Sequence, residues 1–246
     1  MIKWLKTKLW TFIYNAAKAA IEEALDNDSS DMGRQIKRMS RDESAIYALT
    51  KIGLNKTYRD RFALMEHCLE LIPPTGLVLE FGVWKGASIR HLATHLAPRK
   101  IYGFDSFEGL PEDWDCGISK DFFRLTSLPE VPSNVELIKG WFNVTAGDFL
   151  KQHPEPMALL HIDSDIYSSA KFIFDTYGSR IIPGTVILFD EYMNYPTWKT
   201  GEFKAFAEWF EANGARYQYV GFVPKRREPA LESQQVAVQI QEVGAL

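Results

Sequence analysis

Two aspartates separated by one serine close an apolar run in the segment LLHIDSDIYSS. Asp163 and Asp165 stand two positions apart, so in an extended chain both carboxylates point to the same side. Burying two like charges side by side is costly, and we therefore expect them at the rim of a predicted strand, with a cation to compensate them.

A second acidic pair, Asp190 and Glu191, follows the next predicted strand along the chain. Carboxylate oxygens that converge from neighbouring strand ends are the ligands that Mg²⁺ or a similar hard divalent cation prefers. The four carboxylates therefore favour a metal site. The alternative is structural, because Asp165 could cap the helix that begins near Ser168 and Glu191 could face solvent.

The segment LEFGVWKGAS predicts a strand, a glycine turn and the start of a helix, with Glu80, Gly82, Gly86 and Ser88 as candidate binding residues. Glycines let the backbone turn tightly and let a ligand approach the main chain. The spacing is not GxGxxG, which disfavours an NAD pyrophosphate site. A ligand without phosphate at this turn, such as S-adenosylmethionine, needs only the close turn, and a purely structural turn is the alternative.

Asp105 and Ser106 follow the next predicted strand in YGFDSFEGLPEDW. Asp105 lies roughly 20 residues beyond the glycine turn, where a carboxylate can accept both hydroxyls of a ribose. Capping of a turn is the alternative role for Asp105, but position and spacing together favour the ribose.

The histidines carry less chemistry. His161 lies inside a predicted strand and is expected to be a hydrogen-bonded core residue. His91 and His95 are four residues apart on a predicted helix, as zinc ligands can be, but no third ligand follows the pattern. A solvated helix face is therefore the favoured interpretation of this pair.

The elements that must position these residues alternate between strand and helix, which predicts an α/β fold with a parallel sheet covered on both faces and ligands at the carboxyl ends of its strands. Strands are predicted at 77–83, 100–105, 135–140, 158–163 and 185–190, with a closing hairpin of 217–223 and 236–242. Helices are predicted at 46–54, 58–71, 86–96, 146–152, 168–177 and 201–213, and residues 107–134 read as an irregular active-site insertion.

The composition of the chain limits the expected number of domains, the expected partners and the expected cellular setting. The 246 residues are 46% hydrophobic and 24% charged, which suits one large domain with an appendage. A net charge of -4 without a basic run of five residues disfavours nucleic acid as a partner. The two cysteines, Cys68 and Cys116, lack metal-ligand spacing, so a reduced, cytoplasmic setting is the simplest expectation.

Residues 1–25 combine lysines with apolar residues, but polar residues break the run well short of the roughly 20 residues that a spanning helix needs. The apolar positions recur at helical spacing, which predicts an amphipathic helix. We expect it to pack on its own domain or on a partner subunit, with a membrane-surface helix as the alternative. Residues 26–44 are polar and predict a linker, so residues 1–45 are interpreted as helix and linker and 46–246 as the catalytic domain.

Three segments together, GLVLEFGVWKGASIRHLA, IYGFDSFEGLPEDW and LLHIDSDIYSSAKFIFDTYGSRIIPGTVILFDEY, resemble the macrocin O-methyltransferase family of class I S-adenosylmethionine-dependent methyltransferases. The resemblance covers about 62–210. It implies a Rossmann-like class I methyltransferase fold, with a seven-stranded, mostly parallel sheet, an antiparallel last strand and helices on both faces.

The resemblance also implies roles for particular residues. It implies that Glu80, Gly82 and Gly86 surround the methionine part of S-adenosylmethionine and that Asp105 binds the ribose. It implies Mg²⁺ ligation by Asp165, Asp190 and Glu191, although the family usually has two aspartates at the last pair. Ser88 and Ser106 complete the predicted cofactor-binding set.

The function predicted from the sequence is O-methylation of a hydroxyl on a sugar or other small natural-product scaffold. A divalent ion lowers the pKa of a coordinated hydroxyl and fixes it for attack on the sulfonium methyl group, while Asp163 or Asp165 takes the proton. The alternatives are a metal-independent O- or N-methyltransferase and a catalytically silent scaffold recruited by the amino-terminal helix.

Overall fold

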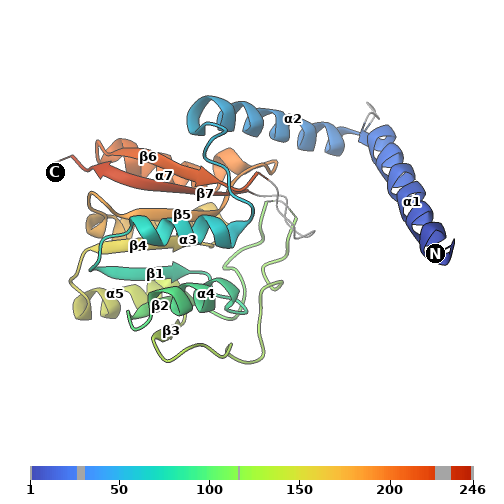
Figure 1. The fold of residues 1–246 in the computed structure, drawn as a ribbon. Coiled ribbons are helices and arrows are strands. Elements are labelled where there is room, and N and C mark those ends of the chain that lie inside the picture. Colours follow the sequence, from blue (N-terminus) through green and yellow to red (C-terminus); the bar gives the residue numbers. More distant parts are fainter. Residues whose placement is uncertain (1, 27–30, 116, 225–233, 245–246) are drawn as a thin grey trace.

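A computed structural model describes residues 2–26, 31–115, 117–224 and 234–244 (Figure 1). Cys116, one of the two cysteines considered above, lies outside these ranges. Within α1 the side chains are described for residues 9–21.

A seven-stranded sheet forms the centre of the molecule, in the order β3-β2-β1-β4-β5-β7-β6. Its first five strands pair in parallel and β7 runs antiparallel to both β5 and β6. The predicted seven-stranded, mostly parallel sheet is therefore confirmed. The strands are β1 (Leu77–Phe81), β2 (Ile101–Asp105), β3 (Val135–Lys139), β4 (Met157–Ile162), β5 (Val186–Met193), β6 (Arg216–Phe222) and β7 (Gln234–Glu242).

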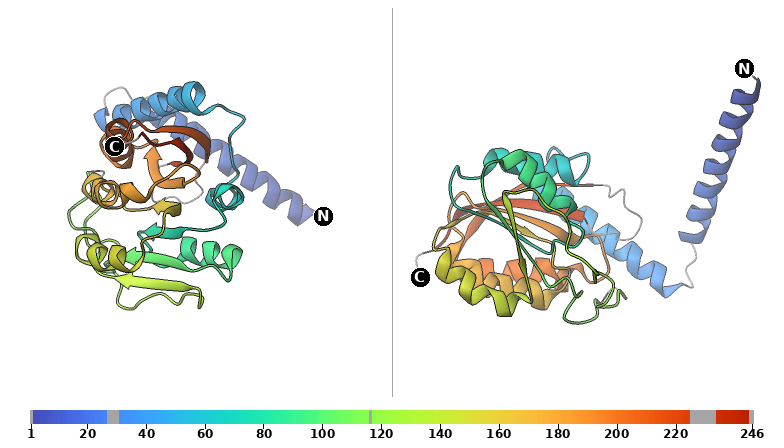
Figure 2. Two further views of the ribbon diagram at one scale, coloured as in Figure 1. Left: turned by 90° about the vertical axis from the view of Figure 1, so that its left-hand side faces the viewer. Right: turned by 90° about the horizontal axis from the view of Figure 1, so that it is seen from below.

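Helices cover both faces of the sheet, as Figure 2 shows. On one face lie α3 (Arg61–Leu71) and α4 (Ala87–Leu96); on the other lie α5 (Phe142–Gln152), α6 (Tyr167–Tyr177) and α7 (Glu202–Ala212). Short 3₁₀ turns, η2 (Gly178–Arg180) and η3 (Trp198–Thr200), follow α6 and precede α7.

The alternation of side chains along each strand divides the core into two layers. In β4, Leu159 packs with α3 and α4, whereas Leu160 packs with the aromatic residues of α6 and α7. Both faces of the central strands are thus buried, which explains why their sequences read as continuous apolar runs rather than alternating ones.

The amino-terminal region differs from the prediction. The stretch predicted as a polar linker is helical from Met32, because Asp31 caps the helix by accepting the N–H of Arg34 at 3.1 Å. This helix, α2 (Met32–Tyr47), continues into a π-helical turn, η1 (Ala48–Ile52), and crosses the predicted boundary between residues 45 and 46. Its end contacts the domain, since Ser44 Oγ accepts the N–H of Asn194 at 2.9 Å.

The first helix, α1 (Ile2–Asp26), extends away from the sheet in every view (Figures 1 and 2). Residues 9–21 are all exposed, so packing of this part of α1 on its own domain, one of the two expected arrangements, is wrong. The exposed residues include Trp10 and Phe12, each 72% exposed. A search of the described helices found none with the length and apolar character needed to cross a membrane.

Candidate active site

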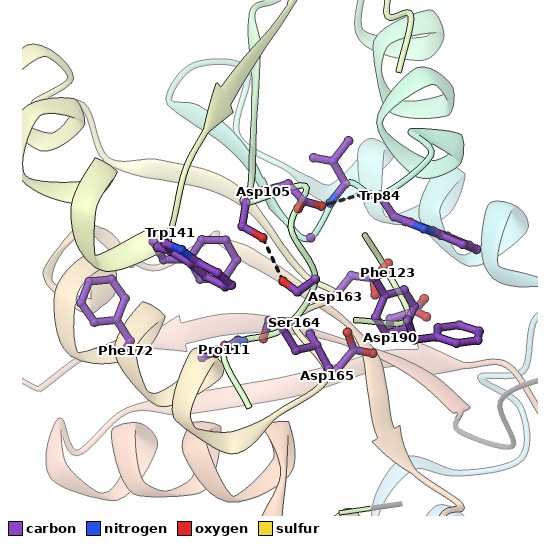
Figure 3. A pocket seen from close by; sticks show the side chains of 18 of the residues that line it. Trp84, Asp105, Pro111, Phe123, Trp141, Asp163, Ser164, Asp165, Phe172 and Asp190 are labelled. Carbon is purple, nitrogen blue, oxygen red and sulfur yellow. Dashed lines mark hydrogen bonds between the residues drawn. The ribbon is translucent and has the colours of Figure 1, made fainter. Parts of the chain in front are cut away.

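A cavity of about 690 Å³ opens at the carboxyl ends of β1 to β5. In Figure 3, Asp163, Asp165 and Asp190 lie between Trp141 and Phe172 on the left and Trp84 and Phe123 on the right. The volume falls in the range of about 300–1,000 Å³ that small-molecule sites occupy. Of the predicted site residues, the cavity is lined by Gly82, Ser88, Asp105, Ser106, Asp163, Asp165 and Asp190.

Asp105 lines the cavity but also organises the surrounding turns. Its Oδ2 accepts the backbone N–H groups of Val83 at 2.8 Å and Trp84 at 2.7 Å, and its Oδ1 accepts that of Phe107 at 2.6 Å. A carboxylate oxygen has about two acceptor positions. Oδ2 is therefore filled, and Oδ1 retains about one acceptor position.

Ser106 stabilises the loop that follows β2. Its Oγ accepts the N–H of Glu108 at 3.0 Å and donates to the carbonyl of Gly109 at 2.9 Å. This bonding holds the start of the predicted insertion against the cavity.

Gly82 is required by the contact between two strand ends. Its φ is +93°, and a Cβ atom there would lie 1.7 Å from the carbonyl oxygen of Asp163. The missing side chain thus lets the main chain after β1 approach the main chain after β4, and it does so beside the cavity.

Gly86 has a φ of +75° and begins α4, but it is not among the described residues that line the cavity. Its conformation serves the turn into the helix.

Glu80 and His161 form a buried polar pair beneath the cavity. His161 Nδ1 lies 2.9 Å from Glu80 Oε2, and Ser88 Oγ donates to Glu80 Oε1 at 2.9 Å. Both oxygens of Glu80 are thus engaged within the protein, and Glu80 is not among the described lining residues. The expectation that His161 is a hydrogen-bonded core residue is confirmed.

The acidic residues after β4 and within β5 form one cluster. Carboxylate oxygens of Asp163, Asp165 and Glu191 lie within 4.8 Å of one another, and so do ligand atoms of His161, Asp163 and Asp190. Asp163 belongs to both groups. Asp163, which the sequence suggested as a catalytic base, therefore also lies close enough to the other carboxylates to be a candidate metal ligand. Glu191 is buried and is not one of the described lining residues, because β5 continues to Met193 instead of ending at Asp190.

Glu202 at the start of α7 completes the cluster and was not identified from the sequence. It is fully buried, and its carboxylate accepts the N–H of Ser164 at 3.1 Å and that of Glu191 at 3.2 Å. It therefore ties the two acidic segments together. A glutamate in the first turn of a helix is common for dipole reasons, so the sequence alone gave no signal that this one is buried.

Burial and mutual repulsion act together on these carboxyls. Burial, then the charge of Asp190, raises the pKa of Asp163 and the pKa of Glu191 well above the ordinary values. Burial raises the pKa of Glu202 to about 8, although the N–H groups of Ser164 and Glu191 oppose the shift. The ionised cluster is thus costly unless protons or a cation compensate it. Carboxylate oxygens that are buried and repel one another in this way are suitable ligands for a divalent cation.

Two non-glycine residues that line the cavity have positive φ, Trp84 at 45° and Asp165 at 64°, and so does Phe107 at 56°, which follows the lining residue Ser106. Such conformations cost about 1–3 kcal/mol each and persist where surrounding structure holds them. They lie in the segments that follow β1, β2 and β4, so the backbone strain is concentrated around the site.

The segment that carries this site is similar in sequence to known proteins. Residues 79–192 match the model of a family described as "Methyltransferase domain". The strand order of the sheet agrees with this match, because it is the order of the class I methyltransferase fold. Residues 79–192 are thus similar to a methyltransferase domain. The matched residues run from β1 to β5 and include every predicted site residue.

Two curated relatives are similar to the chain that carries this methyltransferase domain. One is the 8-demethyl-8-(2,3-dimethoxy-alpha-L-rhamnosyl)-tetracenomycin-C 4'-O-methyltransferase of Streptomyces olivaceus, 27% identical over 59% of this chain and 63% of that protein. The other is the demethyldecarbamoylnovobiocin O-methyltransferase of Streptomyces niveus, 25% identical over 73% of this chain and 76% of that protein. The chain thus spans less than two thirds of the length of the first relative.

The solved structure of CalS11, a calicheamicin methyltransferase, has the same fold as the methyltransferase domain. It superimposes with a TM-score of 0.54 at 22% identity, over 72% of this chain and 76% of that chain. This likeness confirms the predicted class I architecture. The family match over residues 79–192 and the two relatives support the expected enzyme class, a methyltransferase.

Proposed function

We propose that this methyltransferase domain transfers a methyl group from S-adenosylmethionine to a hydroxyl of a sugar or similar small natural-product scaffold. The observation that carries the proposal is the acidic cluster that faces the cavity at the carboxyl ends of β4 and β5, beside the glycine turn after β1. A hydroxyl is a weak nucleophile, and these carboxylates are the groups available to activate it.

The cofactor is proposed to bind over the ends of β1 and β2. Ser106 and Asp105 line this side of the cavity, and Trp141 offers an aromatic surface beside it (Figure 3). Because three backbone N–H groups already occupy Asp105, we propose that Asp105 Oδ1 accepts one ribose hydroxyl instead of both. When bound, S-adenosylmethionine supplies the electrophilic methyl group.

Glu80 and Gly86 have supporting roles in this proposal, because neither lines the cavity; Gly86 begins α4, the helix that carries Ser88. The contacts of Glu80 with Ser88 and His161 favour a role in positioning Ser88 at the cavity rather than direct contact with the cofactor. Gly82 allows the approach of the segment after β4. The methionine part of the cofactor is therefore proposed to meet Gly82 and Ser88.

Mg²⁺ is proposed to bind among Asp165, Asp190 and Glu191, with Asp163 beside them. The raised pKa of Glu191 supports this, because a divalent cation would relieve the repulsion that causes part of the shift. When bound, the ion would lower the pKa of an acceptor hydroxyl and hold it. Glu191 does not line the cavity, unlike Asp165 and Asp190, and is expected to matter least.

Proton removal from the acceptor is assigned to Asp163. It lines the cavity, and its raised pKa brings the carboxylate closer to the range in which a base both exists at neutral pH and binds the proton well. The same property supports the second candidate, a metal-independent O-methyltransferase in which Asp163 acts as the base without an ion.

The nature of the acceptor is inferred from the relatives and from the cavity mouth. Both relatives act on natural products, and one of them is named for a rhamnosyl compound. Trp84 and Phe122, which are 36% and 55% exposed, offer apolar surfaces suited to the C–H face of a sugar. We therefore infer a glycosylated scaffold as the acceptor class.

A metal-dependence assay tests the proposal. Methyl transfer from labelled S-adenosylmethionine to a panel of deoxysugar-bearing acceptors is expected to stop with EDTA and to return with Mg²⁺ or Mn²⁺, while cofactor binding persists. Asp165→Asn and Asp190→Asn are expected to reproduce the loss, and Glu191→Gln to have a smaller effect. Full activity in metal-free protein would leave the metal-independent mechanism as the correct one.

Self-association is proposed to involve α1 and α2. Met32, Ile36, Met39 and Ile46 recur at helical spacing on α2 and are each at least 44% exposed. Together with the apolar residues of α1 they form a surface suited to a second copy of the chain, and contact with a membrane surface is the alternative. Nucleic acid is not proposed as a partner, and a cytoplasmic location stays a prediction.

A further inference from the structure

A second group of potential metal ligands lies on α3 and α4, outside the candidate active site. Glu66 projects from α3 toward His91 and His95 on α4. Glu66 Oε1 lies 3.3 Å from His91 Nε2 and 3.8 Å from His95 Nε2. The ligand missing from the sequence pattern is thus supplied by the neighbouring helix.

The histidines are oriented as ligands. His95 Nδ1 lies 2.9 Å from the carbonyl oxygen of His91, and a carbonyl can only accept, so Nδ1 carries the proton and Nε2 keeps its lone pair. His91 Nε2 is shielded from solvent and lies 3.3 Å from Glu66 Oε1. The Nε2 atoms of both histidines thus lie near the same carboxylate oxygen.

The spacing agrees with tetrahedral coordination. Ligands at about 2.0–2.1 Å from a tetrahedral Zn²⁺ lie about 3.3–3.4 Å from each other. The separation of Glu66 Oε1 from His91 Nε2 is 3.3 Å and that from His95 Nε2 is 3.8 Å, so both carboxylate–imidazole distances lie within a few tenths of an ångström of this value. The three ligand atoms all lie within 4.8 Å of one another.

We propose that Glu66, His91 and His95 form a binding site for a divalent transition-metal ion of the Zn²⁺ type, with water as the fourth ligand. Two imidazole nitrogens and one carboxylate oxygen match the donors that Zn²⁺ accepts, and the two imidazole nitrogens disfavour Mg²⁺. The side chains of His95 and Glu66 are 41% and 48% exposed, which leaves a path for the ion to enter.

Phe62 packs on the ring of His91 with centroids 4.6 Å apart. This packing holds the ring of His91 in place beside Glu66 and so supports the geometry of the site.

The bound ion would link α3 to α4, because its ligands come from both helices. Both helices begin at the cavity, where Arg61 of α3 and Ser88 of α4 are lining residues. A ligand on each helix would resist their separation, so the ion is expected to stabilise the fold. The site uses none of the acidic residues assigned to the methyl-transfer reaction.

Titration with Zn²⁺ tests the inference. The full chain, freed of metal by a chelator and returned to excess Mg²⁺ to saturate the acidic cluster, is titrated by calorimetry and by thermal unfolding. We expect one Zn²⁺ per chain at this site and a rise in Tm. Co²⁺ in place of Zn²⁺ is expected to give the visible absorption of a tetrahedral site.

Matched variants identify the ligands. His95→Gln and Glu66→Gln are each expected to lower Zn²⁺ affinity at least ~tenfold, the lower bound known even for residues that only support a ligand. His67→Ala is the control, because His67 also lies on α3 but pairs with Glu70. The same series in an Asp190→Asn background excludes Zn²⁺ in the acidic cluster.

Two results would overturn the inference. One is the absence of Zn²⁺ binding and of any Tm change in the wild-type chain. The other is a Zn²⁺ affinity that is equal in the wild type, His95→Gln and Glu66→Gln. Circular dichroism of the variants verifies that they fold, which is expected because the substituted side chains are partly exposed.

Discussion

Glu202 gives the sharpest test of the charge balance in the acidic cluster. Its pKa is raised from an ordinary 4.5 to about 8, with burial as the first cause. The folded protein therefore holds this proton more tightly than the unfolded chain does. The stabilising contribution is complete below about pH 4.5 and is lost as the pH rises toward 8.

The size of the effect follows from this difference. For one group titrating at 4.5 in the unfolded chain and at about 8 in the fold, the free energy of unfolding falls by about 2–3 kcal/mol between about pH 5.5 and about pH 7.5. For a chain of this length that corresponds to about 5–10 °C in Tm.

The assay is thermal or urea unfolding in EDTA across this pH range. Glu202→Gln is expected to remove about 2–3 kcal/mol from the pH-dependent change. Glu211→Gln, at the exposed end of the same helix, is the matched control and is expected to keep the wild-type slope. Added Mg²⁺ is expected to flatten the wild-type dependence, because a cation favours ionised carboxylates. Equal slopes in all three proteins would refute the reasoning.

Three further outcomes are expected. Asp105→Asn should weaken the binding of S-adenosylhomocysteine by about 1.5–3 kcal/mol in calorimetry. Asp113→Asn is the control and should leave binding unchanged, because Asp113 accepts the N–H of Lys120 and does not line the cavity. Equal affinities of the two variants would remove Asp105 from the cofactor site. Gly82→Ala should destabilise the fold by about 3 kcal/mol or more in urea unfolding, because its Cβ would lie 1.7 Å from the oxygen of Asp163, whereas Gly147→Ala, with nothing within 4 Å, should not. Deletion of residues 1–25 should leave cofactor binding intact and reduce self-association in light scattering; an unchanged oligomer that loses binding to lipid vesicles would favour the membrane alternative.

The sheet could be predicted from the sequence because its strands are short apolar runs that end at turn residues or carboxylates. Leu77–Phe81 and Met157–Ile162 are buried on both faces, and nothing else in the sequence competes for that pattern. The alternation with helices then sets the parallel order and the edge at which the acidic residues meet.

Other features depend on contacts between distant segments. The α2 helix was missed because the polar residues around Met32, Ile36 and Met39 outweigh its apolar stripe, which faces solvent. The extension of β5 beyond Asp190 depends on pairing of Met193 with Gln234 of β7. No local signal reports either contact.

The same limit applies to the sites. Glu202 joins the acidic cluster only because α7 begins beside the ends of β4 and β5, and Glu66 meets His91 only because α3 packs along α4. The residue types were visible in the sequence, but their partners were set by tertiary packing.

The acidic cluster combines two kinds of backbone. Asp190 and Glu191 lie within β5, between Phe189, which pairs with both β4 and β7, and Met193, which pairs with β7. Asp163 and Asp165 lie on the connection between β4 and α6, where Asp165 holds a left-handed conformation. This connection is tied to its neighbours, because the N–H of Asp163 donates to the carbonyl of Phe81 and the N–H of Ser164 donates to Glu202. A shift of either acidic segment would therefore be felt by β1 and α7 as well, so the cluster is expected to respond to a ligand as one unit.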